Sequence, residues 1–172
     1  RAALCRDLGI EGRSVSMAHQ VHGAGVHRVG ARPTDSLFPD ALVGWPEADV
    51  LVTQEPDTPL MVLGADCLPV ILWRRDHPAL GVAHAGWRGL VGGVLEAAIG
   101  ALGEPSRLGA AIGAGIGPCC YPVSAEVRER FATRFGDGVV AGEAVDLAGA
   151  ARAALARCGV PASAIQVVAA CT

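Results

Sequence analysis

The chain has 172 residues, of which 51% are hydrophobic and 18% are charged, a balance typical of a folded domain with a buried core. All 14 basic residues are arginine, which excludes a Schiff-base lysine and the lysine of a phosphate-binding P-loop. A formal net charge of −3, scattered arginines and only 4% aromatic residues argue against a nucleic-acid-binding face.

The first quarter of the chain is predicted to begin in a helix and to continue in short strands. Residues 1–10 are typical of the last turns of a helix that stops at a glycine. Residues 14–19 alternate in polarity and are predicted to form a strand, and a second strand at 25–29 could pair with it. Residues 30–48 contain several prolines and are expected to form a long loop.

Short apolar runs dominate the middle of the chain. They are rich in Leu and β-branched residues and are bounded by Pro, Gly or Asp, so strands are favoured over helices. The predicted strands are residues 49–53, 60–64, 69–73 and 79–84. The connections between the last three are too short for helical crossovers, which predicts an antiparallel meander.

The second half is predicted to alternate between helices and strands. The predicted elements are a helix at 87–102, a strand at 107–112, helices at 125–135 and 147–158, and a strand at 165–169. Ser124 and Asp146 are predicted N-caps, and the first helix is predicted to run through Gly92 and Gly93. The pattern indicates one α/β (α+β-like) domain over residues 1–172, a mixed β-sheet with an antiparallel meander flanked by helices.

The predicted meander brings Cys67 and His84 to one edge of the sheet. Its first and third strands point the same way, so the residues after their C-terminal ends emerge together. Because neighbouring strands lie about 4.8 Å apart, these ends are expected about 10 Å apart at the backbone. Gly or Pro follows each residue closely, and rigid turns at strand ends are where scaffolds present reactive groups.

A cysteine and a histidine held together support two kinds of chemistry. In a Cys–His hydrolase, the imidazole lowers the pKa of the thiol, and the thiolate of Cys67 attacks an acyl group. In a metal site, Cys67 and His84 bind Zn²⁺ and a third ligand leaves one coordination position open. His22 ends a predicted strand before a glycine and is the candidate third ligand. Each of these residues alone is also typical of a buried cysteine or an ordinary histidine.

Further candidates surround this set. Asp66 could orient a ligand, act as an acid or base, or cap its turn. Arg88 is the best-placed anion binder because its guanidinium offers a rigid fork of donors, although it could equally cover an apolar surface. The glycines of residues 113–117 do not complete a phosphate-loop motif and instead indicate a close backbone approach. Cys119 and Cys120 could face the same pocket or fill space.

The remaining cysteines and histidines carry no such signal. The six cysteines are irregularly spaced without a CxxC pair, which favours neither a disulfide framework nor a zinc finger. Cys5 and Cys158 are interpreted as buried thiols in a reducing compartment, and His19, His27 and His77 as structural or exposed. No apolar run reaches the roughly 18 residues of a membrane span, and no secretory start is visible, so we expect a soluble cytoplasmic protein.

Four motifs stand in order along the chain: QVHG at 20–23, ADCLP at 65–69, AHAGWRG at 83–89 and IGPCCYPV at 116–123. With DVLVT at 49–53 and the final ACT, they resemble the laccase-domain, or polyphenol-oxidase-like, family over nearly the whole chain. The family usually has an Arg-Gly-Gly-Ser-like turn near its N-terminus and a Ser-Tyr/His-Arg-Arg-like segment after Cys-Thr. We expect this chain to lack both family ends.

The resemblance implies a zinc site made by His22, Cys67 and His84, in a cleft over a mixed α/β sheet. It also implies a purine nucleoside phosphorylase that deaminates adenosine, and some family members are called peptidoglycan editing factors. The predicted substrates are a purine nucleoside and inorganic phosphate, with no nucleic acid and no membrane. The predicted catalytic residues are His22, Cys67, His84, Asp66 and Arg88.

Three other functions stay open at this level. A copper-dependent polyphenol oxidase would use Cys and His, but the sequence lacks the many histidines of a multicopper cluster. A Cys–His amidase acting on peptidoglycan precursors would use Cys67 as its nucleophile. A metal-stabilised binding module would close the site with a fourth protein ligand.

Overall fold

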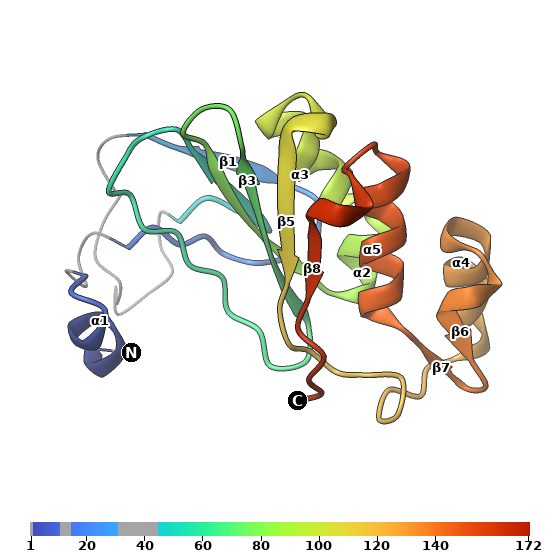
Figure 1. Cartoon of the computed structure of the whole chain (residues 1–172). Coiled ribbons are helices and arrows are strands. Elements are labelled where there is room, and N and C mark those ends of the chain that lie inside the picture. The colour runs from blue at the N-terminus through green and yellow to red at the C-terminus, as the bar shows by residue number, and fades with distance from the viewer. Residues whose placement is uncertain (1, 11–14, 31–44) are drawn as a thin grey trace.

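The framework of the molecule is a six-stranded mixed β-sheet, shown in the computed structural model of Figure 1, which describes residues 2–10, 15–30 and 45–172. Its strands are β1 (Val26–Val29), β2 (Val50–Thr53), β3 (Leu68–Arg74), β4 (Leu80–Ala85), β5 (Leu108–Ile112) and β8 (Ile165–Val167). They lie in the order β1-β2-β4-β3-β5-β8. The two outer pairs are parallel and the three inner pairs are antiparallel, which confirms the predicted mixed sheet.

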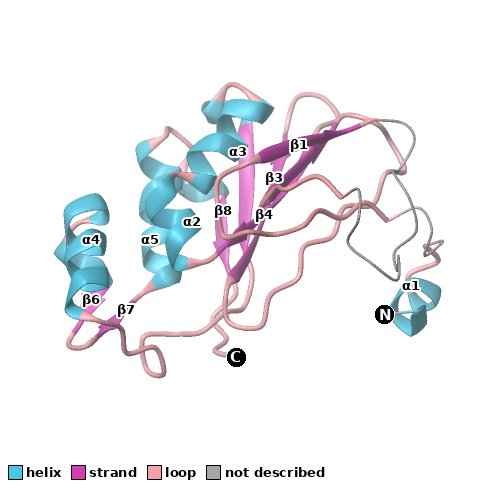
Figure 2. Cartoon of the chain, turned by 180° about the vertical axis from the view of Figure 1, so that it is seen from behind, coloured by secondary structure: helices cyan, strands magenta, loops and turns pink. Residues whose placement is uncertain are grey.

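Helices cover one face of this sheet. They are α2 (Trp87–Gly92), α3 (Val94–Leu102), α4 (Ala125–Phe135) and α5 (Leu147–Arg157), whereas α1 (Ala2–Asp7) lies apart from them on the other side of the sheet (Figure 1). Figure 2 shows α2, α3 and α5 beside the sheet, with α4 farther out and the short hairpin of β6 (Val140–Ala141) and β7 (Ala144–Val145) below it. Single 3-10 turns lie at Pro105–Arg107, Asp137–Val139 and Ala162–Ala164. Among the described residues, no helix is long and apolar enough to cross a membrane.

The sheet packs against a large core on one face and, around β2 and β4, against a smaller core on the other, because successive side chains alternate between the faces. Val50 and Val52 face the larger core, which the helices complete with large residues such as Phe131. Leu51, between them in sequence, points to the other face and packs with Val82 in a smaller core. Loop segments rather than helices close that second face (Figure 2).

Both predicted N-caps are confirmed. The Ser124 side chain accepts a hydrogen bond from the Val127 N–H at the start of α4, and Asp146 accepts one from Gly149 at the start of α5. The predicted helix at 87–102 is in fact two helices. Gly93 has φ +90° and donates its N–H to the end of α2, so a left-handed residue separates α2 from α3.

The predicted strand pairing was wrong in two places. Residues 60–64 form no strand, and Leu60 makes only a single bridge to Ser16. The place beside β3 that these residues were expected to fill is taken by β5, and β2 pairs with the other edge of β4. All four residues of β2 are buried, as a central strand requires, whereas Leu63 is exposed. Within the predicted strand at 14–19, residues 15–19 make isolated bridges only, and β1 pairs with β2 in parallel. Most of the predicted loop at 30–48 lies outside the described residues.

Candidate metal centre

The antiparallel pairing of β3 with β4 brings Cys67 and His84 together. Pro69 is paired with His84 and Leu68 with Ala85, so Cys67, just before β3, lies beside the end of β4. The predicted shared edge is therefore correct, but the two residues belong to adjacent strands. We expected one strand between Cys67 and His84 and about 10 Å between their backbones. Both expectations were wrong, because Cys67 directly precedes β3, and β3 pairs with β4.

His22 is held in an uncommon backbone conformation by a buried carboxylate. Its φ is +60°, a left-handed value that costs a non-glycine residue about 1–3 kcal/mol. The Asp49 carboxylate, which is fully buried, accepts the backbone N–H groups of Val21, His22 and Gly23 at 3.2, 3.0 and 2.7 Å. These charge-assisted hydrogen bonds offset the cost and fix the direction of the His22 side chain.

The same carboxylate orients His84. Its Oδ1 atom lies 2.8 Å from Nδ1 of His84, whose residue is only 4% exposed. Because a carboxylate only accepts hydrogen bonds, Nδ1 carries the proton and the lone pair is on Nε2. The Asp–His pair is the arrangement that fixes the tautomer of a metal-binding histidine and raises its basicity.

The ligand atoms of His22, Cys67 and His84 all lie within 4.8 Å of one another. The two imidazole rings meet edge to face, with centroids 4.8 Å apart and planes 72° apart. Zinc bonds of about 2.0–2.3 Å in a tetrahedron place ligand atoms roughly 3.3–3.8 Å apart, so modest closure suffices. One thiolate and two imidazoles are donors that zinc prefers, and the three residues therefore fit such an ion.

A glycine leaves room for this convergence. A Cβ atom on Gly86 would lie 2.7 Å from the Cys67 Sγ and 3.2 Å from Cδ2 of His22. Both distances are shorter than ordinary van der Waals contact, so any side chain here would push ligands apart. The φ of Gly86 is −78°, which any residue adopts, and the requirement is therefore one of space.

The electrostatic surroundings favour a cation over a bare thiolate. Burial raises the pKa of the Cys67 thiol, and the negative charges of Asp66 and Asp49 raise it further. A Cys–His hydrolase requires the opposite shift, because its thiolate is the nucleophile. A bound cation would supply the missing positive charge, so the surroundings of Cys67 favour the metal interpretation.

The three residues lie in the wall of a pocket of about 690 Å³. Its other lining residues are Ala18, His19, Gln20, Trp45, Leu63, Gly64, Ala65 and Asp66. His22 is exposed, Cys67 is half-buried and His84 is buried, so the cluster is open toward the pocket on one side. An open position is the pattern of catalytic rather than structural zinc.

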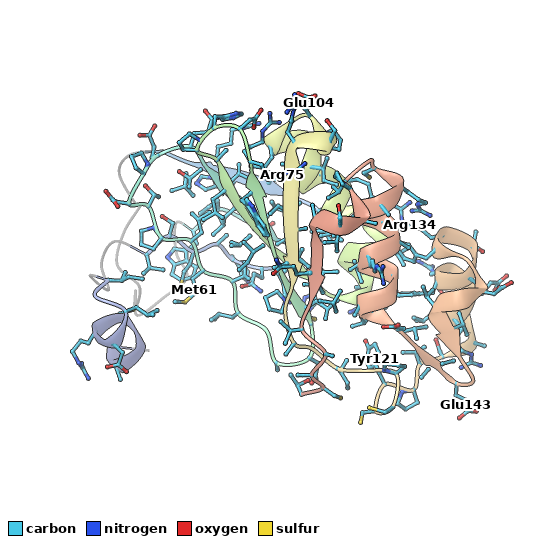
Figure 3. The ribbon with its side chains drawn as sticks, viewed as in Figure 1. Met61, Arg75, Glu104, Tyr121, Arg134 and Glu143 are labelled. Carbon is cyan, nitrogen blue, oxygen red and sulfur yellow. The ribbon has the colours of Figure 1, made fainter. Side chains whose placement is uncertain are left out.

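The other predicted site residues divide between the pocket and its surroundings. Asp66 lines the pocket with the three candidate ligands. Arg88 does not line it and is exposed, with its guanidinium 4.7 Å from the centroid of the Trp87 ring. Tyr121, on the connection between β5 and α4, is labelled in Figure 3. Burial raises the pKa of Tyr121, the charge of Cys67 raises it further and Arg88 lowers it, so Tyr121 feels both Cys67 and Arg88.

Sequence reasoning missed four residues of this region. Asp49 was interpreted only as the start of a strand, yet a carboxylate beside the fully buried run VLVT is itself a signal, since a buried charge needs partners. His19 was set aside as structural or exposed, but it lines the pocket. Gly86 and Tyr121 carried no signal outside the motifs that contain them.

Two curated proteins show the relationship of the chain to known sequences. It is 39% identical over 183 residues to a purine nucleoside phosphorylase of Xylella fastidiosa (strain Temecula1), covering 100% of this chain and 67% of that protein. It is 38% identical over 113 residues to the purine nucleoside phosphorylase YfiH of Escherichia coli K12, covering 65% of this chain and 43% of that protein. The chain therefore spans about two thirds or less of the length of these relatives.

Solved structures share the fold. The Bacillus licheniformis hypothetical protein YfiH superimposes with a TM-score of 0.88 at 25% identity, covering 98% of this chain and 68% of that one. YlmD of Geobacillus stearothermophilus superimposes with a TM-score of 0.83 at 29% identity, covering 98% of this chain and 67% of that one. A family model described as "Multi-copper polyphenol oxidoreductase laccase" matches residues 1–172. The chain belongs to this laccase-like family.

Proposed function

We propose that the protein is a zinc-dependent purine nucleoside phosphorylase that also deaminates adenosine. The observation that carries the proposal is the convergence of His22, Cys67 and His84 in the wall of an open pocket, with Asp49 fixing two of them. The curated relatives are named purine nucleoside phosphorylases, which supports the substrate class.

The pocket has the size and lining that a nucleoside needs. Its volume of about 690 Å³ falls within the usual range of small-molecule sites. Trp45 and Leu63 supply apolar surface for a purine base. The amide of Gln20 is already used, because it bonds both the carbonyl and the N–H of Leu63 at 2.7 Å. His19 and Asp66 are therefore the pocket groups we assign to the polar atoms of the substrate.

In phosphorolysis, an oxygen of inorganic phosphate forms a bond to C1′ of the ribose while the bond from C1′ to N9 breaks. The electron pair of that bond stays on the purine, and we assign the Asp66 carboxylate to take a proton from the attacking phosphate and pass it to the purine. Arg88 is assigned to the phosphate, because among the described residues no carboxylate pairs with its guanidinium. The long Arg88 side chain would act from the rim of the pocket.

Bound zinc would supply Lewis acidity, polarising a substrate oxygen or lowering the pKa of a water molecule. In deamination, water adds to C6 of adenine and the amino group leaves as ammonia, as in other zinc deaminases. Asp66 is the pocket carboxylate available to move the proton from the water to the leaving group. Both reactions thus use one pocket and one proton carrier.

The direct test combines metal analysis with two assays on the same preparation. We expect zinc in the purified protein, phosphate-dependent release of hypoxanthine from inosine, and release of ammonia from adenosine. Chelation should abolish both activities and added Zn²⁺ should restore them. Cys67→Ser and His84→Ala should lose the zinc ion of this centre and activity together, whereas Cys158→Ser, which changes a thiol outside the pocket, should keep both. Full activity in a metal-free Cys67→Ser protein would refute the proposal.

A second candidate is oxidation of phenols with copper, since two histidines and one cysteine are also a ligand set of copper proteins. Among the described residues, however, no further cluster of histidines is present to build a multicopper centre. Oxygen uptake with a phenol and copper, without phosphorolysis, would favour this candidate. Activity on a peptidoglycan precursor that survives chelation but not thiol alkylation would favour a Cys–His amidase.

A further inference from the structure

Three cysteines outside the pocket converge at the C-terminal end of the sheet. Cys119 and Cys120 lie on the connection from β5 to α4, and Cys171 follows β8. The Sγ atoms of Cys119 and Cys120 are 3.1 Å apart, and those of Cys119 and Cys171 are 3.6 Å apart. All three sulfur atoms lie within 4.8 Å of one another, and all three residues are exposed.

The convergence follows from the parallel pairing of β5 with β8. Both strands end on the same side of the sheet, and Figure 1 shows the C-terminus beside the loop that follows β5. Gly115 continues the pairing through a bridge to Cys171, and its carbonyl accepts the N–H of Thr172 at 3.3 Å. The Cys120 N–H then bonds the carbonyl of Gly117 at 3.0 Å, a turn that returns its side chain toward Cys171.

We propose that Cys119, Cys120 and Cys171 form a second metal site, which binds a thiophilic ion such as Zn²⁺ or Cu⁺ through three thiolates. Three thiolates with one position left to water suit tetrahedral Zn²⁺, and three alone suit Cu⁺. The site shares no ligand with the His22, Cys67 and His84 cluster. It does not depend on the function proposed for the pocket.

The spacing of the sulfur atoms matches such an ion. Zinc–sulfur bonds of about 2.3 Å in a tetrahedron put the sulfurs roughly 3.8 Å apart. The observed separations of 3.1 and 3.6 Å, and a third within 4.8 Å, need shifts of about 1 Å or less. Exposed side chains on loop segments can make shifts of this size.

Hydrogen bonding within the cluster favours a shared negative charge. The Gly117 N–H donates to the Cys171 Sγ at 3.2 Å, a hydrogen bond that stabilises negative charge on this sulfur atom. Thiolates this close to one another repel, so the cluster does not favour more than one negative charge without a cation. A cation removes that repulsion and allows all three thiolates to form.

Metal stoichiometry gives the first test. Reduced, metal-free protein is loaded with Zn²⁺, or with Cu⁺ in a separate anaerobic series, and metal per chain is measured after gel filtration. We expect two zinc ions per wild-type chain and one in Cys119→Ser/Cys120→Ser/Cys171→Ser. Cys67→Ser should also hold one, and the matched control Cys158→Ser should hold two. The copper series identifies the preferred ion, and loss of one equivalent in the triple variant supports the site in either series.

Cobalt absorption gives a second test that does not depend on activity. The intensity of the sulfur-to-Co²⁺ charge-transfer band counts Co–S bonds, so wild type should show four, Cys67→Ser three and the triple variant one. If the triple variant does not fold, Cys171→Ser alone should lower the intensity by at least one quarter. A reduced wild-type chain that binds one metal, with the triple variant unchanged, would overturn the proposal. So would a disulfide between two of the three cysteines that persists in the reduced preparation.

Discussion

Asp49→Asn is the change that best isolates how the candidate metal centre is built. The Asp49 Oδ2 accepts Val21 and Gly23, and its Oδ1 accepts His22 and the Nδ1 proton of His84. Asparagine keeps one oxygen and replaces the other with an NH₂ donor. Whichever way the amide turns, two of the four donors face another donor in a fully buried position.

The magnitude follows from those two orphaned donors. Each buried donor left without an acceptor costs about 1–3 kcal/mol, so the free energy of unfolding should fall by about 2–6 kcal/mol, or by about 1–3 kcal/mol if His84 changes tautomer to accept from the NH₂ group. If the NH₂ group faces His84, the imidazole must carry its proton on Nε2, which removes the lone pair that a metal needs. Loss of such a carboxylate partner typically lowers metal affinity by about 10–100-fold.

Two measurements check this prediction. Urea unfolding of the metal-free protein reports stability, and competition with a chromophoric chelator reports zinc affinity. Both are measured in a chain in which Cys119, Cys120 and Cys171 are replaced by serine. Asp146→Asn is the matched control, because asparagine and aspartate are equally good N-caps at α5. Zinc affinity equal to wild type, with nitrogen NMR showing His84 still protonated on Nδ1, would refute the reasoning.

Three further changes have defined outcomes. Gly86→Ala should lower zinc affinity about tenfold or more, because its Cβ would lie 2.7 Å from the Cys67 Sγ; the competition titration measures this. Phe131→Ala should lower the free energy of unfolding by about 3–5 kcal/mol in urea, because this ring is fully buried in the larger core. Asp76→Asn should destabilise the protein at neutral pH and progressively less as the pH falls from about 4 toward 2, because the Arg74 hydrogen bond lowers the pKa of Asp76 to about 2; urea unfolding against pH measures the difference.

The sign of the Asp76 effect follows from linkage. A carboxyl group whose pKa is lower in the folded state contributes stability above its unfolded pKa of about 3.9. That contribution is lost as the pH falls from about 4 through 2, so the wild type and Asp76→Asn should converge there. A difference that persists unchanged at pH 2 would contradict the assignment, as would unaltered zinc affinity in Gly86→Ala or full stability in Phe131→Ala.

Elements with local signals were predictable from the sequence. Ser124 and Asp146 are N-caps whose effect depends on residues three positions away, so α4 and the start of α5 were predicted correctly. β3 and β4 followed from short apolar runs with fixed boundaries. The pairing of strands was not predictable in the same way. The apolar run at 60–64, which forms no strand, has the same sequence pattern as β2, which does.

Long-range contacts account for the rest of what was missed. The role of Asp49 depends on His22 and on His84, which lie 27 and 35 positions away in the sequence. The requirement for Gly86 depends on contacts with Cys67 and His22, not on its own backbone conformation. Candidate ligands can be recognised by residue type, whereas the residues that position them are visible only in the folded chain.

Protein hydrogen bonds hold two residues of the candidate centre in place. Zinc fingers fold only when their ion binds, and their ligands are not preorganised without it. Here His22 is held at a left-handed φ by three hydrogen bonds to Asp49, and His84 is fixed by a fourth. Strain of this kind persists only where surrounding contacts determine it, and those contacts are all protein atoms. Histidine ligands held by protein contacts in this way can leave one coordination position to a substrate.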